Sequence, residues 1–190
     1  MTFSPLKGFL TLALAAVAAA PAAAKDNPAL KALEDALPGT LLHDPLNLKW
    51  VPGGNDIKSK VVPAEALMSG QAIRTTVKRK QENGWETQIA TAIPQEIKAG
   101  DTIEVYYYVR TAKAPEGAEA ADVAMFLGRR VDPFDSIIFH EFRPGPEWEM
   151  QKVQGTAAAD FKKNSVKLEY HLGKAAQEVE IGPVYVSVLD

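Results

Sequence analysis

The chain has 190 residues, of which 46% are apolar and 24% charged; this composition is ordinary for a globular protein and excludes a mainly disordered or fibrous chain. Its 21 Lys and Arg residues against 24 Asp and Glu residues give a net charge of −3, too balanced for the basic surface of a general nucleic-acid binder. The chain has no cysteine, which excludes disulfides, thiol catalysis and cysteine-based metal sites.

Residues 1–24 have the pattern of a cleaved signal peptide. Lys7 provides the positive start, an apolar run covers 9–20, and Ala22-Ala23-Ala24 offers small residues for cleavage. The apolar run is shorter than the ~20 residues that span a bilayer. We therefore expect export to the periplasm or the cell exterior, and no membrane span after cleavage.

Residues 25–60 are predicted to form an N-terminal extension of a short helix and a loop. Leucines at helical spacing follow an Asn-Pro cap and favour a helix over 27–37. Turn residues then predict a loop up to residue 55. We expect Trp50 to close the core where this extension meets the following domain.

Residues 61–190 are predicted to form one all-β domain, a β-sandwich. Strand patterns recur between turn clusters, without a linker or an internal repeat. The predicted strands are Ala72–Lys78, Glu86–Ala92, Thr102–Thr111, Val123–Arg129, Ser136–Phe142, Glu149–Gln154, Val166–Leu172 and Val179–Leu189.

Alternation within these strands predicts sheets with one apolar face and one polar face carrying aromatic rings. In the strand 102–111, every second residue from Ile103 to Val109 would face one side of the sheet. The other side would carry polar and aromatic residues: Glu104, Tyr106, Tyr108 and Arg110. In the strand 166–172, Lys167, Glu169 and His171 oppose an apolar row. Such a polar, aromatic face is a candidate ligand surface; the alternative is a merely solvated face.

No motif of a known catalytic class is present, including the nucleophile elbow, zinc-protease and nucleotide-binding patterns. His140 and Glu141 are adjacent, so in a strand they point to opposite faces and cannot share one metal. Glycoside hydrolysis needs two facing carboxylates, and the sequence does not show which acidic residues would pair.

Several segments, in this order, resemble carbohydrate-binding modules of the CenC type, which group families 4, 9 and 22. They are Gly70–Val77, Asn83–Ile89 with its Trp-x-x-Gln element, Ile97–Arg110, Glu147–Glu149, Val166–Gly173 and Val179–Val186. The resemblance implies a galactose-binding-like jelly roll that holds β-glucan- or xylan-like chains in a cleft on one sheet.

In such modules aromatic rings stack on sugar while amide and charged side chains bind hydroxyl groups. The candidate ligand-binding residues, from the resemblance and the sheet faces, are Trp85, Gln88, Tyr106, Tyr108, Arg110, Glu169 and His171. The resemblance implies no cofactor. Where many relatives carry an acidic pair that helps hold a structural calcium, this chain reads Gly182-Pro183, which argues against that ion.

We therefore expect a non-catalytic carbohydrate-binding protein whose partner is a polysaccharide or oligosaccharide. An exported glycanase or another envelope protein is a further expected partner. The first alternative is an envelope protein-interaction module without sugar binding, and the second is a small glycoside hydrolase.

Overall fold

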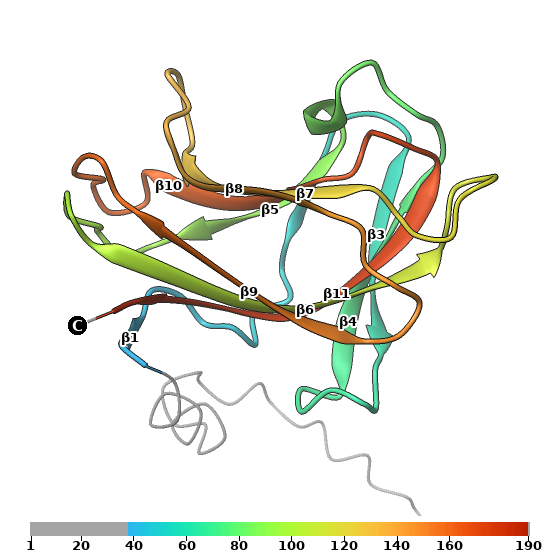
Figure 1. The fold of residues 1–190 in the computed structure, drawn as a ribbon, viewed down its shortest axis with the longest axis horizontal. Helices are drawn as coiled ribbons and strands as arrows, with labels where there is room; N and C mark the ends of the chain where they lie inside the picture. Colours follow the sequence, from blue (N-terminus) through green and yellow to red (C-terminus); the bar gives the residue numbers. More distant parts are fainter. Residues whose placement is uncertain (1–37, 190) are drawn as a thin grey trace, which may run out of the picture.

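The chain folds as a sandwich of two antiparallel β-sheets, as the sequence predicts (Figure 1). A computed structural model describes residues 38–189. The predicted signal peptide and the helix over 27–37 lie outside the described residues.

Each sheet combines one pair of consecutive strands with strands that are distant in sequence. The six-stranded sheet has the order β3 (Ile57–Pro63), β4 (Gln71–Val77), β11 (Gln177–Val188), β6 (Thr102–Lys113) and β9 (Glu149–Thr156), with β1 (Thr40–Leu41) paired to β11. The five-stranded sheet has the order β2 (Val51–Gly53), β5 (Gln88–Ile93), β10 (Val166–His171), β7 (Val123–Arg129) and β8 (Ser136–Phe142).

The core lies between the two sheets and follows the predicted alternation. In β6 the residues Ile103, Val105, Tyr107 and Val109 are fully buried, and so are Val166, Leu168 and Tyr170 in β10. The rings of Tyr107 and Tyr170 meet edge to face with centroids 5.8 Å apart. Trp50 stacks on Tyr170 at 5.6 Å and packs against this core from the segment before β2.

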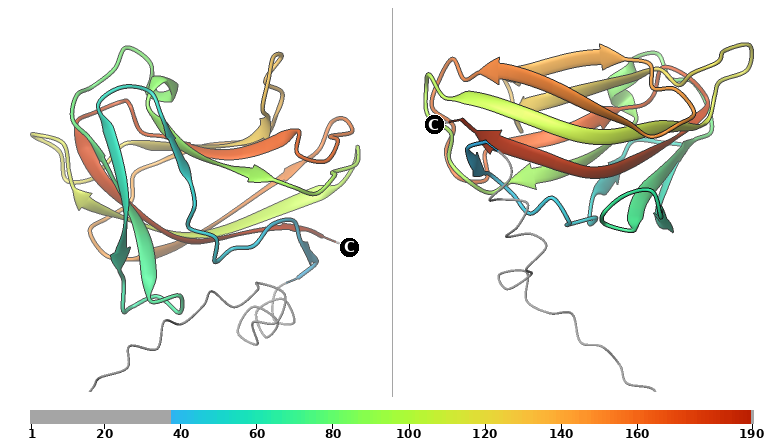
Figure 2. Two further views of the ribbon diagram at one scale, coloured as in Figure 1. Left: turned by 180° about the vertical axis from the view of Figure 1, so that it is seen from behind. Right: turned by 60° about the horizontal axis from the view of Figure 1, so that its bottom comes forward.

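The sandwich begins earlier in the chain than residue 61. β3 pairs with β4 from Ile57 to Pro63, so the predicted boundary between residues 60 and 61 falls within a strand. β1 joins the six-stranded sheet and β2 the five-stranded sheet, and Figure 2 shows the connecting segment passing from one sheet to the other.

These early strands lie at sheet margins, where the apolar alternation is weak. β3 places Ser59 at an inner position, with its Oγ 3.0 Å from Oγ1 of Thr75, and carries exposed lysines at positions 58 and 60. β2 contains Pro52 and Gly53, residue types that normally argue against a strand and are tolerated at an edge. The weak alternation and the turn residues of β2 and β3 explain why the sequence predicts an extension and not part of the sandwich before residue 61.

A buried carboxylate joins three strands on the outer face of the six-stranded sheet. Glu180 in β11 is fully buried; Arg74 in β4 donates to its Oε1 from Nε at 2.7 Å, and Arg110 in β6 donates to its Oε2 from Nε at 2.6 Å. The guanidinium of Arg110 lies 4.9 Å from the ring centroid of Trp148. A buried carboxylate is tolerated because both of its oxygens are paired.

We predict that Glu180→Gln lowers the free energy of unfolding by about 2 kcal/mol, because it removes the charge that both arginines face. The value is below that of a fully buried pair because the arginine side chains are 34% and 31% exposed and partly screened. Urea unfolding measures it. Glu178→Gln, on the same strand and more exposed, is the matched control; an equal loss in both variants would contradict the prediction.

Candidate functional site

The candidate site lies on the outer face of the five-stranded sheet and is centred on β10. Because Val166, Leu168 and Tyr170 enter the core, the alternate residues of β10 point outward. These are Lys167, Glu169 and His171. β10 is the middle strand, paired with β5 on one side and β7 on the other, so this row runs through the centre of the face.

Glu169 is the polar centre of the site. It is only 4% exposed, and its Oε1 lies 2.8 Å from Nε2 of His171 while its Oε2 lies 2.8 Å from Nζ of Lys167. Burial by itself would raise the pKa of Glu169, but the hydrogen bond to His171 and the contact with Lys167 outweigh it and hold the pKa below its ordinary value. The carboxylate is therefore charged at neutral pH.

Aromatic rings surround this polar row. Phe126 in β7 is opposite Glu169 in the strand pairing, and its ring stacks on His171 with centroids 6.0 Å apart. Lys167 Nζ lies 5.5 Å from the ring centroid of Phe126 and 5.3 Å from that of Phe134. Three of the rings around the row are more than half exposed: Trp85, Phe134 and Phe139.

A cavity of about 480 Å³ lies beside the polar row. It is lined by Trp85, Gln88, Phe126, Phe134, Lys167, Glu169 and His171. A second cavity, of about 710 Å³, shares Gln88, Lys167 and Glu169 with the first and extends past β2 to the segment 43–49. We call the two adjoining cavities the groove.

Two loops rise above the sheet beside the groove. Figure 1 shows the loop between β7 and β8, which carries Phe134, and the segment before β5, which carries the 3₁₀ turn η2 (Gly84–Glu86). Trp85 belongs to η2. Polar groups on β5 and β10 therefore form the floor of the groove, and rings on the two loops form part of its walls.

The turn between β10 and β11 holds η2 through backbone contacts. The Gly173 amide donates to the Gly84 carbonyl at 2.9 Å, and the Leu172 amide donates to the Thr87 carbonyl at 2.8 Å. A Cβ atom on Gly173 would lie 2.9 Å from the Gly84 oxygen, closer than real Cβ contacts. Glycine at position 173 therefore allows the approach that places Trp85.

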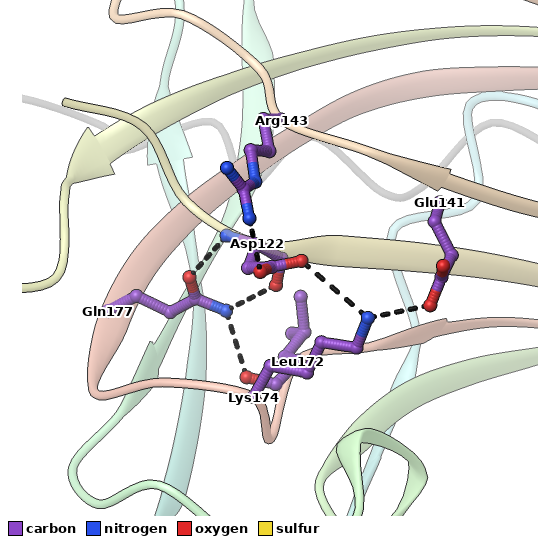
Figure 3. Close-up of polar contacts among 6 residues, drawn as sticks. All are labelled: Asp122, Glu141, Arg143, Leu172, Lys174 and Gln177. Atoms are coloured by element: carbon purple, nitrogen blue, oxygen red, sulfur yellow. Dashed lines mark hydrogen bonds and ion pairs between the residues drawn. The ribbon is translucent and has the colours of Figure 1, made fainter. Parts of the chain in front are cut away.

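A charged network steadies the same turn (Figure 3). Lys174 Nζ lies 2.6 Å from a carboxylate oxygen of Glu141 and 3.8 Å from one of Asp122, and its stem packs over Gly84. Gln177 Nε2 donates to the Asp122 carbonyl at 2.8 Å and to the Leu172 carbonyl at 2.9 Å. The network links β7, β8 and β11 to the segment that carries Trp85.

The structure brings four of the seven predicted site residues together. Trp85, Gln88, Glu169 and His171 all line the groove. Glu169 and His171 are expected from the alternation of their strand, and Trp85 and Gln88 from the Trp-x-x-Gln element of the resemblance.

The other three predicted residues lie on the outer face of the other sheet and do not join the groove. The ring of Tyr106 contacts Lys152, whose Nζ lies 5.1 Å from the ring centroid. Tyr108 and Trp148 pack against a small apolar cluster. Arg110 is paired with Glu180. The sequence showed that these side chains share a face, but it did not show to which sheet their strand belongs.

Two groove aromatics, Phe126 and Phe134, were absent from the sequence-based candidates, as was Lys167. Phe126 lies in Val123–Arg129, where all but the last residue are buried, so no polar alternation marks its outward direction. Phe134 follows a turn-forming Asp-Pro pair and reads as a loop residue.

Within residues 38–189, no three His, Asp or Glu side chains are grouped so that they could hold a metal ion. In the same residues, no helix is long and apolar enough to cross a membrane.

Comparison with known proteins places the fold among carbohydrate-binding modules. No family model and no curated protein matches the sequence. Among solved structures, the second N-terminal cellulose-binding domain of Cellulomonas fimi β-1,4-glucanase C is similar with a TM-score of 0.56 at 17% identity, over 81% of this chain and 94% of that one.

Two further modules are similar to the same extent. The CBM22-1 xylan-binding domain of Paenibacillus barcinonensis Xyn10C has a TM-score of 0.54 at 16% identity, over 80% of this chain and 97% of that one. A CBM4 structure has a TM-score of 0.53 at 13% identity, over 73% of this chain and 91% of that one. The expected jelly-roll fold of these modules is confirmed.

We predict that Glu169→Gln lowers the free energy of unfolding by about 2 kcal/mol at pH 7. The neutral amide makes weaker hydrogen bonds with Lys167 and His171 than the charged carboxylate does. The folded-state pKa of Glu169 is depressed, so its stabilisation is complete above the ordinary pKa of 4.5 and disappears as the pH falls through the folded value. Urea unfolding at pH 7, 5 and 3 should show the gap between the two proteins closing toward pH 3. A gap that stays constant with pH would contradict this assignment.

We predict that Gly173→Ala displaces Trp85 while leaving the sandwich folded, because the added Cβ would press on the Gly84 carbonyl. The indole N–H signal of Trp85 in an NMR spectrum should shift, whereas that of Trp50, which packs against the core away from this turn, should stay. Ala176→Ser, in the same turn but exposed, is the control. An unshifted Trp85 signal would show that the turn does not position this ring.

Proposed function

We propose that this chain is an exported, non-catalytic carbohydrate-binding protein that holds a polysaccharide or oligosaccharide in the groove. The observation that carries the proposal is the combination, on one sheet face, of exposed rings with a row of fixed polar groups. Sugar rings present C–H faces that pack on aromatic side chains and hydroxyl groups that need hydrogen-bond partners. The names of two similar structures, a cellulose-binding and a xylan-binding domain, support this class of ligand.

Binding would use the groove largely as it stands. Trp85 and Phe134 offer exposed ring faces for stacking. Gln88 can donate and accept hydrogen bonds to hydroxyl groups, and Oε1 of Glu169, which His171 orients, would accept them. Pre-oriented partners reduce the entropy lost on binding, so modest contacts over several sugar units can give useful affinity.

Glycoside hydrolysis is the weaker alternative because of the state of Glu169. A hydrolase of that kind needs a general acid whose pKa is raised, together with a second carboxylate. The pKa of Glu169 is lowered, and its two oxygens already face Lys167 and His171. The groove therefore favours binding over proton donation.

Export to the periplasm or the cell exterior remains part of this proposal and rests on the signal pattern in residues 1–24. The proposal includes no cofactor. An exported glycanase or another envelope protein is a natural companion, because a binding module that does not cleave its ligand acts by holding it near an enzyme or a surface.

We predict that Trp85→Ala weakens glycan binding at least about tenfold, whereas Tyr106→Ala changes it less than about twofold, because only Trp85 lies at the groove. Isothermal titration against xylan, mixed-linkage glucan, cellulose and alginate oligosaccharides measures both variants. Unchanged circular dichroism and unfolding midpoints serve as the folding control.

Three outcomes would count against this prediction. Equal losses in the two variants would remove the groove from the binding site, and a loss in Tyr106→Ala alone would move the site to the six-stranded sheet. No binding of any glycan would refute carbohydrate binding and favour the protein-interaction alternative, with the exposed Phe134 and Phe139 as contact residues.

A further inference from the structure

The larger cavity of the groove has more cations than carboxylates around it. Its positively charged lining residues are Lys49, Arg130 and Lys167, and its negatively charged ones are Asp44 and Glu169. Burial lowers the pKa of His43, another lining residue, to about 4, so its ring adds no charge at neutral pH. The chain as a whole carries −3, so this local excess runs against the overall charge.

Pairing within the groove leaves two of these cations available. Lys167 is occupied by Glu169 at 2.8 Å. Arg130 is exposed, and among the described residues its Nη1 donates to the neutral carbonyl of Asn164, at 3.3 Å. Lys49 is exposed as well. Within residues 38–189, neither Arg130 nor Lys49 has a carboxylate at ion-pair distance.

Arg130 is well placed to meet a ligand. It follows directly on β7, and its backbone amide donates to the Ser165 carbonyl at 2.9 Å, which ties the start of the loop to the chain just before β10. The same loop carries Phe134, whose ring lies over Lys167 in the adjoining cavity. A ligand stacked on Phe134 would therefore extend along the groove toward the guanidinium.

We propose that the glycan bound in the groove is acidic, with uronic acid carboxylates that pair with Arg130 and, at the far wall, with Lys49. This inference rests on the proposed carbohydrate binding and narrows its ligand class. A guanidinium binds a carboxylate through two parallel charged hydrogen bonds, which neutral hydroxyl groups cannot match. A neutral glycan would offer these two cations hydroxyl oxygens and no carboxylate.

The test compares each acidic oligosaccharide with an uncharged partner of the same backbone. Oligogalacturonate is paired with its methyl ester, and oligomannuronate and glucuronoxylan oligosaccharides are paired with their carboxyl-reduced forms. Titration calorimetry is run on wild type, Arg130→Gln and Lys60→Gln, with Trp85→Ala as the test of the groove itself. Lys60 is the matched control because it is an exposed cation on β3, in the other sheet.

We expect at least one acidic ligand to bind about tenfold more tightly than its uncharged partner, and Arg130→Gln to remove most of that difference. Lys60→Gln should change either affinity less than about twofold, since an exposed charge in the other sheet is screened from the groove. Lys49→Gln should act in the same direction as Arg130→Gln, with a smaller effect because an ammonium lacks the paired donors.

Two results would overturn the acidic-ligand inference while leaving carbohydrate binding intact. One is equal affinity for every acidic ligand and its uncharged partner, with both lost in Trp85→Ala. The other is an equal effect of Arg130→Gln and Lys60→Gln, which would mean non-specific attraction to the whole surface. Absence of binding to all acidic and neutral glycans would overturn this inference and the proposed function together.

Discussion

The two-residue alternation of β10 is the constraint on which both the core and the groove depend. Val166, Leu168 and Tyr170 enter the core, and this places Lys167, Glu169 and His171 on the outer face. A slip of one residue would bury the Glu169 carboxylate among apolar side chains without a partner. Burying an unpaired charge costs far more free energy than any single contact contributes to stability. Pairing with β5 and β7 on both sides holds the register.

The two sheets use buried carboxylates in different ways. Glu180 is enclosed by two arginines, with Trp148 over one of them, and its side chain is fully buried, out of reach of a ligand. Glu169 has similar burial, but it lies in the floor of an open groove, and both its partners are neighbours on its own strand. The first arrangement joins strands β4, β6 and β11. The second places a charged group beside exposed rings, the combination on which the proposed sugar binding rests.

Much of the fold could be predicted from periodicity. Val123–Arg129 and Ser136–Phe142 were predicted with the bounds that β7 and β8 have, because turn residues flank both. β3 could not be recognised, since Ser59 at an inner position interrupts its apolar row and is satisfied only by Thr75 across the strand pair. In the site, the alternation of the strand 166–172 predicts Glu169 and His171 as outward residues, and the resemblance implies Trp85 and Gln88. Phe126 could not, because its strand is buried on both faces.

The sequence alone therefore determined most of the strands and, where polar and apolar residues alternate, the direction of their side chains. These follow from local rules, namely alternation and turn chemistry, which act between near neighbours. The tertiary structure decided which faces belong together. β6 carries Tyr106, Tyr108 and Arg110 outward just as β10 carries Glu169 and His171, but β6 pairs with β11 and β9 while β10 pairs with β5 and β7. Most of these pairings join residues far apart in the chain. The contacts that determine them are therefore not local and leave no periodic signal in the sequence.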